Sequence, residues 1–228
     1  MKLTYLGHSS VMISTNHGSR IIIDPYHLKV NKTFPKVKSD VVLISHLHPD
    51  HNAPHLVMGN PKVLRRTTDS LASFEIKFDK EVIEFLAIPS FHDNLEGKKY
   101  GPNTIWFFVV DGIRVAHCGD LGHILKEQQI NQIGGIVDVL IAPVGGGGYT
   151  IGPSEILILM EQLKAMICIP IHYKTSYTPW IASSWDEINY PSIQVCNDYF
   201  VTINSLPELP KILVFPEEIW QQIPESID

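Results

Sequence analysis

His46-Leu47-His48-Pro49-Asp50-His51 places three imidazoles and one carboxylate within six residues, shortly after the apolar run of residues 41–44. Imidazole and carboxylate groups hold zinc or iron without redox-labile thiolates, and residues two apart on an extended, turning chain can point at one ion. Asp50 and His51 lie further round the same turn, where a second ion fits. A solvated histidine-rich loop would explain this composition but not the matching residues further along the chain. The stretch therefore predicts a metal site behind a buried strand.

These six residues resemble the H-x-H-x-D-H motif of the metallo-β-lactamase superfamily, and the resemblance covers most of the chain. The family pattern continues with a downstream histidine, an aspartate after a glycine behind a strand, and a late histidine closing another strand; His92, Asp120 and His172 follow in that order. The nearest likeness is to compact, stand-alone metal-dependent hydrolases, including those similar to ascorbate-6-phosphate lactonase and to the phosphodiesterases that act on N-acyl-ethanolamine phospholipids. The motifs that carry it are Gly7-His8-Ser9, Ile23-Asp24-Pro25, Gly119-Asp120 and Ile169-Pro170-Ile171-His172-Tyr173.

The resemblance implies an α/β fold, an αββα sandwich of two mixed β-sheets flanked by helices, which we expect to form a single domain over residues 1–228. It also implies metal ligands in two shells that share one aspartate. The ligands are His46, His48 and His92 for one ion, Asp50, His51 and His172 for the other, and Asp120 for both. Three nitrogens suit a tetrahedral zinc ion with water, and a shared carboxylate can hold two ions about 3.5–4 Å apart. We expect two divalent ions, zinc foremost, with manganese or iron as substitutes because such sites accept several metals.

The expected chemistry is hydrolysis of an ester, lactone or phosphodiester bond. Water between two such ions loses its proton near neutral pH and becomes a bridging hydroxide nucleophile. Asp120, as the bridge, and Asp50, as an acceptor that orients the hydroxide, are the expected catalytic residues. Two alternatives stay open: iron-dependent oxygen or sulfur chemistry on the same fold, and a non-catalytic metal-binding module.

Residues around the expected ligands have two interpretations each. His8 either lines the metal pocket or is a hydrogen-bonded histidine without a chemical role. Asp24 ends a very apolar strand; the resemblance implies that it braces the metal-binding loop, and a simple Asp-Pro turn is the alternative. Gly145 and Gly146 belong to a run of four glycines whose amides can approach either a substrate oxygen or the neighbouring loop. Tyr173 opens an aromatic-rich stretch that forms either a wall of the substrate pocket or an edge packed on the core.

His117 and Cys118 lie next to Gly119-Asp120 but are not expected to be ligands. Cys118 has the size of a small core residue. Alternation along the strand points the side chain of His117 away from the side that Cys118 faces.

Composition limits which classes of protein and which partners we expect. With 228 residues, 44% of them hydrophobic, the chain can bury the core of one large α/β domain. The net charge of −6, with lysine and arginine spread thinly, gives no basic stripe for nucleic acid. No apolar run reaches the ~20 residues of a spanning helix, so we expect no stable membrane anchor. Met1 leads straight into a predicted strand, and three widely spaced cysteines suit reduced thiols, so we expect a cytoplasmic protein.

We expect the substrate to be a small anionic molecule. Two divalent ions outweigh the carboxylates of Asp50 and Asp120 and a bridging hydroxide, which leaves the pocket cationic inside an anionic protein. A low-dielectric cleft focuses such a field. The sequence leaves the oligomeric state open.

Hydrophobic patterning predicts the elements that carry these motifs. Alternation near the start of the chain predicts an antiparallel meander, and Asp111-Gly112 predicts a hairpin turn. Strands are expected over 3–6, 10–13, 20–23, 62–65, 75–78, 82–88, 104–110, 113–116, 137–142, 166–171 and 212–215, and helices over 124–133 and about 153–164. The residues after 215 are expected to form a polar tail.

Overall fold

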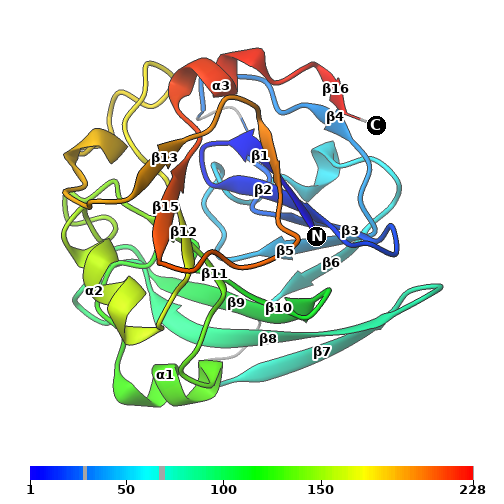
Figure 1. Ribbon diagram of the computed structural model, residues 1–228, viewed down its shortest axis with the longest axis horizontal. Coiled ribbons are helices and arrows are strands. Elements are labelled where there is room, and N and C mark those ends of the chain that lie inside the picture. The colour runs from blue at the N-terminus through cyan, green and yellow to red at the C-terminus, as the bar shows by residue number, and fades with distance from the viewer. Residues whose placement is uncertain (28–29, 67–69, 228) are drawn as a thin grey trace.

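The computed structural model describes residues 1–27, 30–66 and 70–227, which form two facing β-sheets with helices outside them (Figure 1). The first sheet has six strands in the order β14-β1-β2-β3-β5-β6. They are β1 (Lys2–Gly7), β2 (Ser10–Ser14), β3 (Arg20–Ile23), β5 (Val41–Ile44), β6 (Lys62–Arg65) and β14 (Phe200–Thr202). Strands β1 to β3 form the expected antiparallel meander, and β5 and β6 continue it in parallel.

The second sheet has eight strands in the order β13-β15-β12-β11-β10-β9-β8-β7. They are β7 (Ala72–Lys77), β8 (Val82–Phe91), β9 (Pro102–Val110), β10 (Ile113–His117), β11 (Val139–Pro143), β12 (Ile167–Ile171), β13 (Ile193–Val195) and β15 (Lys211–Val214). Strands β7 to β10 are antiparallel, whereas β10, β11, β12 and β15 are parallel. Asp111 and Gly112 join β9 to β10 with φ values of 52° and 76°, as a tight hairpin turn requires.

Helices cover the outside of both sheets. Helices α1 (Glu127–Ile133) and α2 (Glu155–Gln162) pack on the outer face of the eight-stranded sheet, and α3 (Glu217–Gln222) lies beside β1 (Figure 1). Two 3₁₀ turns, η1 (Pro54–Leu56) and η2 (Trp185–Glu187), and a small sheet of β4 (Lys36–Val37) and β16 (Ser226–Ile227) complete these elements. The αββα sandwich implied by the resemblance is therefore confirmed.

Alternating side chains along the central strands build two hydrophobic cores that share the eight-stranded sheet. On β11, Val139 and Ile141 belong to the core between the sheets, whereas Leu140 and Ala142 belong to the core beneath α1 and α2. A strand buried on both faces has a nearly continuous apolar sequence. This is why the pattern predicts a buried parallel strand here, and the pairing of β11 with β10 and β12 confirms it.

The segment after β15 is not the expected polar tail. Its helix α3 buries Trp220 completely, with ring centroids 6.3 Å from Tyr5 and 5.9 Å from Tyr26. A helix of six residues is too short for its apolar period to be recognised in the sequence. Gly7 makes room for the indole, because a Cβ there would lie 1.9 Å from Trp220 Nε1. The C-terminal segment thus packs against the loop that begins at His8.

Strand direction brings the predicted site residues to one edge of the sandwich. Strands β1, β3 and β5 run in the same direction in the first sheet, and β8, β10 and β12 do so in the second. Ligands of α/β sheets bind beyond the carboxyl ends of strands. The residues that follow those ends are His8, Asp24, His46 to His51, His92, Asp120 and His172.

Candidate metal centre

Asp120 lies at the centre of a cluster of imidazoles. Its Oδ2 atom is 3.0 Å from His92 Nε2 and 3.2 Å from both His51 Nε2 and His172 Nε2. His46 Nε2 lies 3.7 Å from the same oxygen. The carboxylate is buried, and its Oδ1 atom has no hydrogen-bond partner. One oxygen that faces four ring nitrogens is the arrangement expected of a shared metal ligand.

The potential ligand atoms fall into overlapping groups, in each of which they lie within 4.8 Å of one another. The first group is His46, His48 and His92; the second group is His8, Asp50, His51 and His172; a third group of His46, His51 and Asp120 joins them. The structure thus brings together every residue that the sequence analysis named as a ligand. That each of them holds an ion stays a prediction.

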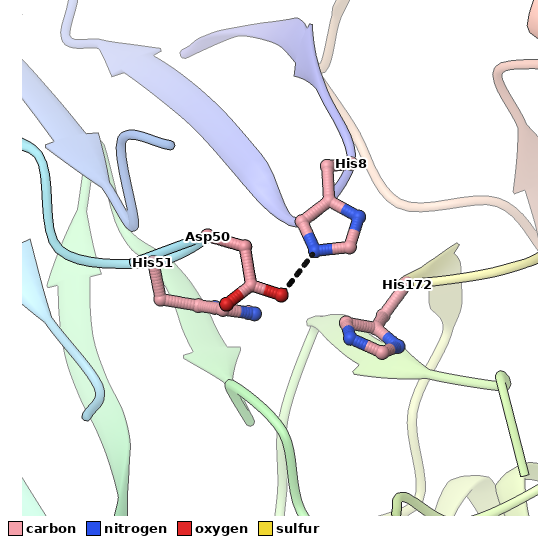
Figure 2. Close-up of side chains that lie close together, drawn as sticks. All are labelled: His8, Asp50, His51 and His172. Carbon is pink, nitrogen blue, oxygen red and sulfur yellow. Dashed lines mark ion pairs between the residues drawn. The ribbon is translucent and has the colours of Figure 1, made fainter. Parts of the chain in front are cut away.

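His8 joins the second group, although the sequence left its role open. Figure 2 shows its ring facing Asp50 beside His172, with His8 Nε2 3.6 Å from Asp50 Oδ2. Both ring nitrogens are buried without a hydrogen-bond partner. The backbone is held, because the His8 carbonyl accepts hydrogen bonds from His172 N (3.2 Å) and Tyr5 Oη (3.3 Å). The ring is therefore placed at the centre with a nitrogen available for an ion or a substrate atom.

Asp24 braces the histidine-rich loop from the end of β3. Its Oδ1 atom accepts a hydrogen bond from Ser45 N (2.7 Å), and its Oδ2 atom accepts from Ser45 Oγ (2.6 Å) and His51 Nδ1 (3.0 Å). Because the Ser45 proton goes to Asp24, Ser45 Oγ accepts from His46 Nδ1 (2.9 Å). Protons on both Nδ1 atoms leave the Nε2 atoms of His46 and His51 as lone-pair donors to a metal.

The residue that follows the glycine run, Tyr149, supports the centre through its carbonyl group. His92 Nδ1 donates to Tyr149 O at 2.7 Å, which directs Nε2 of the same ring towards Asp120. The Gly146 amide donates within the loop, to Ile151 O (3.2 Å) and Thr150 Oγ1 (3.1 Å). Because that amide is already engaged, the geometry does not support the interpretation of Gly146 as part of an anion cradle.

Two glycines allow chain segments to approach closely around the centre. A Cβ at Gly145 would lie 2.4 Å from His172 O. A Cβ at Gly119, whose φ is 53°, would lie 2.5 Å from Asn103 Oδ1 and from Ser45 Cβ. For Gly145 this favours the close approach to a neighbouring loop, the second of the two interpretations that the sequence left open.

Asn103 holds the backbone of the candidate centre, a position that the sequence did not predict. Its Oδ1 atom accepts a hydrogen bond from Asp120 N (3.1 Å), and its Nδ2 atom donates to Ser90 Oγ and Cys118 O at 2.8 Å each. It therefore fixes the backbone that carries the central aspartate. An asparagine in a strand belongs to no motif, and only its burial between β8 and β10 gives it this role.

His117 and Cys118 stay outside the groups, as expected. His117 Nε2 donates to Ser9 O (2.9 Å), and its Nδ1 accepts from Gly119 N (3.1 Å), so both nitrogens are used. Cys118 is a buried free thiol whose pKa is raised to about 12 by burial. Neither side chain offers a ligand atom to the centre.

The charge states of His8, His46 and Asp120 suit metal binding, whereas for His51 and His92 burial acts to lower the pKa but the adjacent Asp120 raises it above the ordinary value, so an ion bound there would displace a proton. Burial lowers the pKa of His46, and burial next to His172 lowers the pKa of His8 to about 4, so both rings are neutral at pH 7. Burial acts to raise the pKa of Asp120, but the adjacent His172 and His51 hold it well below its usual range. Neutral imidazoles and an ionised carboxylate are the forms that bind divalent ions.

Buried side-chain nitrogen and oxygen atoms without a hydrogen-bond partner show whether metal ions fit this site. They are both ring nitrogens of His8, Nε2 of His46 and of His51, Nδ1 of His172, and Oδ1 of Asp120. Buried polar atoms are almost always hydrogen-bonded, so a cluster of this kind needs an explanation. Because these atoms come from imidazoles and a carboxylate gathered at one point, bound divalent ions explain it.

A cavity of about 360 Å³ opens over the centre, and its walls include Gly145, Gly146 and Trp180. The aromatic stretch after β12 thus supplies one wall, as one of its two interpretations held. Tyr173 does not line this cavity: its hydroxyl is buried and donates to Phe215 O. Of the two interpretations of Tyr173, the geometry favours the edge packed on the core, because the side chain after His172 turns away from the cavity.

Comparison with known proteins agrees with this geometry. The chain matches the model of the beta-lactamase superfamily domain over residues 2–172. It is 30% identical over 206 residues to a protein of Geobacillus thermodenitrificans described as a metal-dependent hydrolase, covering 77% of this chain and 86% of the relative. A protein of Thermococcus onnurineus with the same description is 27% identical over 211 residues, covering 82% of this chain and 90% of the relative.

A solved structure shares both fold and sequence. A crystal structure from Thermotoga maritima, provisionally described as a Zn-dependent hydrolase of the metallo-beta-lactamase superfamily, is 33% identical. It superimposes with a TM-score of 0.76 over 93% of this chain and 97% of that one.

Proposed function

The chain belongs to the beta-lactamase superfamily and is a metal-dependent hydrolase, and from this premise we propose that it uses two divalent ions to cleave an ester, lactone or phosphodiester bond in a small anionic substrate. The observation that carries the proposal is the position of Asp120 Oδ2, which lies 3.0–3.7 Å from four imidazole nitrogens. A carboxylate in that position can serve both groups of ligands at once.

The first group and Asp120 would hold one ion, and the second group and Asp120 the other. The donors are imidazoles and carboxylates without thiolates, a set that favours zinc and accepts manganese or iron. Bound there, the ions supply an activated water and polarise the bond under attack.

The chain's own residues orient the reactants. Asp50 lines the cavity over the centre, where its carboxylate can accept a hydrogen bond from the attacking water. His8 faces that carboxylate and restricts its orientation. Asp24 and Asn103 keep the ligand loops in place through backbone and side-chain hydrogen bonds. Hydrolysis then joins the water oxygen to carbon or phosphorus, while the leaving oxygen departs with a proton.

The proposed partner is a small molecule. The net charge of −6 argues against nucleic acid, and among the described residues no helix has the length and apolarity needed to cross a bilayer. The cavity volume of about 360 Å³ is within the usual range of small-molecule sites. Of the three readings that the sequence left open, hydrolysis is the one that the descriptions of the relatives support.

Metal analysis followed by substrate screening tests the proposal. We expect two ions per chain in protein loaded with zinc, and hydrolysis of at least one member of a panel of lactones, aryl esters and aryl phosphodiesters. His172→Ala should reduce the stoichiometry, because it removes a ligand of the second group. A stoichiometry fixed at one ion and unchanged in His172→Ala would contradict the two-ion proposal.

A further inference from the structure

Strand β7 forms an open edge of the eight-stranded sheet. Figure 1 shows it as the outermost strand, in a hairpin with β8 that extends beyond the neighbouring elements. It is six residues long, whereas the other edge strands of the two large sheets, β6, β13 and β14, have three or four. Among the described residues, no strand pairs with the outer side of β7. A long strand with one unpaired side presents a row of backbone donors and acceptors to another chain.

Strand β7 has few of the features that block pairing at an open edge. Its ladder with β8 runs from Ala72 to Lys77 without a bulge, and the Phe78 amide continues the hairpin by donating to Glu81 O at 2.8 Å. The strand contains no proline. Short edge strands, prolines, bulges and lysines normally prevent pairing between molecules. Of these, β7 has only Lys77, which accepts a neighbouring strand that places a carboxylate opposite it.

The two faces of β7 differ in character. Phe74, Ile76 and Phe78 face the core between the sheets, where Ile76 is buried and the two phenylalanines are only partly covered. Glu75 and Lys77 are exposed on the opposite face, with Lys77 Nζ 3.9 Å from Glu75 Oε1. A partner strand that extends the sheet must therefore place apolar residues beside the phenylalanines and charges beside Glu75 and Lys77.

Glu75 lies opposite a like charge in its own sheet. Its cross-strand partner on β8 is Glu84, and both side chains are exposed. Like charges directly opposite one another destabilise a β-ladder. Lys77 lies opposite Val82, which carries no charge. A cation on the free side of Glu75 would offset the repulsion within the chain.

The charges select one pairing of β7 with a second copy of itself. A two-fold axis perpendicular to the sheet joins two β7 strands antiparallel and keeps each side chain on its own face. With the axis at Ile76, Glu75 of each copy lies opposite Lys77 of the other, and Phe74 lies opposite Phe78. An axis at Phe74 brings no opposite charges together. An axis at Glu75 or at Lys77 places two like charges on the axis.

We propose that two copies of this chain pair through residues 74–78, antiparallel about a two-fold axis at Ile76, and join their eight-stranded sheets into one continuous sheet. The contacts between copies are backbone hydrogen bonds, two Glu75–Lys77 ion pairs and two Phe74–Phe78 aromatic pairs. Five residues per chain are far fewer than the roughly 20–30 residues per side of a standard interface, so we expect a reversible dimer with a dissociation constant of about 10–100 µM. This inference is independent of the metal centre and of the proposed function.

Sedimentation velocity of the full chain tests the proposal. The concentration runs from about 2 to 200 µM, a range that brackets the affinity expected of a small interface. The mean mass should rise from 25.7 kDa towards twice that value. A monomer at every concentration would mean that the edge stays open or takes a different partner, and would overturn the proposal.

Charge reversal tests the register of the pairing. Glu75→Lys and Lys77→Glu each place like charges opposite one another twice, so each should weaken the dimer about tenfold or more. The double variant restores opposite charges in exchanged positions and should dimerise again. Glu208→Lys is the control, because it makes the same change of charge at an exposed residue between β14 and β15, which lie away from β7 in their sheets. Thermal unfolding verifies that every variant is folded.

An equimolar mixture of the two single variants distinguishes this register from other dimers. In a mixed dimer of Glu75→Lys and Lys77→Glu, every opposed pair again carries opposite charges, so the mixture should dimerise where neither variant does alone. A mixture that associates no more strongly than its components would contradict the proposed register. A dimer that Glu208→Lys weakens as much as Glu75→Lys does would place the interface elsewhere and overturn the proposal.

Hydrogen exchange locates the interface by a separate measurement. Pairing removes the outward backbone amides of β7 from water, so residues 72–78 should exchange more slowly in concentrated than in dilute protein. The edge strand β14 should exchange equally in both. A dimer in which residues 72–78 exchange as fast as in the monomer would show that β7 is not the contact.

Discussion

The imidazoles of the centre differ in how they are held. His46, His51 and His92, the fixed imidazoles, each donate from Nδ1 to an oxygen of Ser45, Asp24 or Tyr149. His8 and His172, the unfixed imidazoles, have Nδ1 atoms buried without a partner among the described residues. A ring whose Nδ1 atom is hydrogen-bonded presents its Nε2 atom in one orientation. An unfixed ring loses conformational entropy when an ion binds, and this loss lowers the affinity for the ion. Two of the fixed rings, His46 and His92, belong to the first group, and His51 is the one fixed ring of the second group, so of the two proposed ions we expect the one in the first group to bind more tightly.

The largest effect is expected from changing the Asp120 carboxylate, which is common to both groups of ligands. Asp120→Asn should lower kcat/KM for any identified substrate by about a hundredfold or more, because loss of an outer-shell partner alone costs about 10–100-fold. The metal content should fall at the same time. The reference is His8→Ala, which should be less harmful, and near wild-type turnover in Asp120→Asn would show that this carboxylate is not the bridge.

The next largest effect is expected from changing Asp24, whose hydrogen bonds hold two of the fixed imidazoles. Asp24→Asn weakens the support of His51 in the second group directly and of His46 in the first group through Ser45, so the affinity for both proposed ions should fall, by about 10–100-fold. Competition with a fluorescent zinc chelator measures this affinity. Asp40→Asn serves as the control, since that carboxylate accepts a hydrogen bond from the Arg20 amide away from the centre. Equal affinities in the two variants would mean that the outer hydrogen bonds do not organise the site.

Substituting one unfixed and one fixed imidazole in separate variants tests whether the two proposed ions bind with different affinities. His8→Gln should weaken only the second, looser ion, by about tenfold, whereas His46→Gln should weaken the tighter one. Stepwise zinc titration followed by calorimetry resolves the two events. If His8→Gln and His46→Gln weaken the same binding event, the fixed and unfixed imidazoles do not serve different ions.

The smallest effect is expected for Tyr149→Ala. The group that holds His92 is the backbone carbonyl of Tyr149, so removing the side chain should change metal affinity by less than about twofold. Chelator competition measures it, beside substrate affinity, which should fall because the ring that stacks on Tyr100 is gone. A large loss of metal affinity would show that the loop, and not only its carbonyl, depends on the ring.

Much of the fold and site follows from local sequence. The β1–β2–β3 meander, the Asp111-Gly112 turn and the buried β11 have patterns that one segment specifies by itself. The His46 to His51 stretch is recognisable because its ligands lie close together in the chain. His117 was separated from the ligands by strand alternation alone, and its two hydrogen bonds agree with that interpretation.

The residues that the sequence did not reveal depend on distant partners. Asn103 gains its role only because β9 lies between β8 and β10, and the ring of His8 gains its neighbours only when the two sheets meet. Trp220 was missed because six residues do not show a helical period. The sequence left two interpretations of Tyr173 open because the turn of the chain at His172, whose φ is 50°, is a feature of the folded loop.

The candidate ligands stretch from His8 to His172: those up to His51 follow strands of the six-stranded sheet, and those from His92 onward follow strands of the eight-stranded sheet. Contacts between residues so far apart in the chain are costly to close and form late in folding. A growing chain on the ribosome can expose the His46 to His51 stretch early, but it cannot complete the second group until β12 has emerged and docked and brought His172 into place. If the second group holds an ion as proposed, its capture is coupled to completion of both sheets, and the fraction of molecules that retain a second ion after a chelating wash reports how much of a preparation has folded to the end.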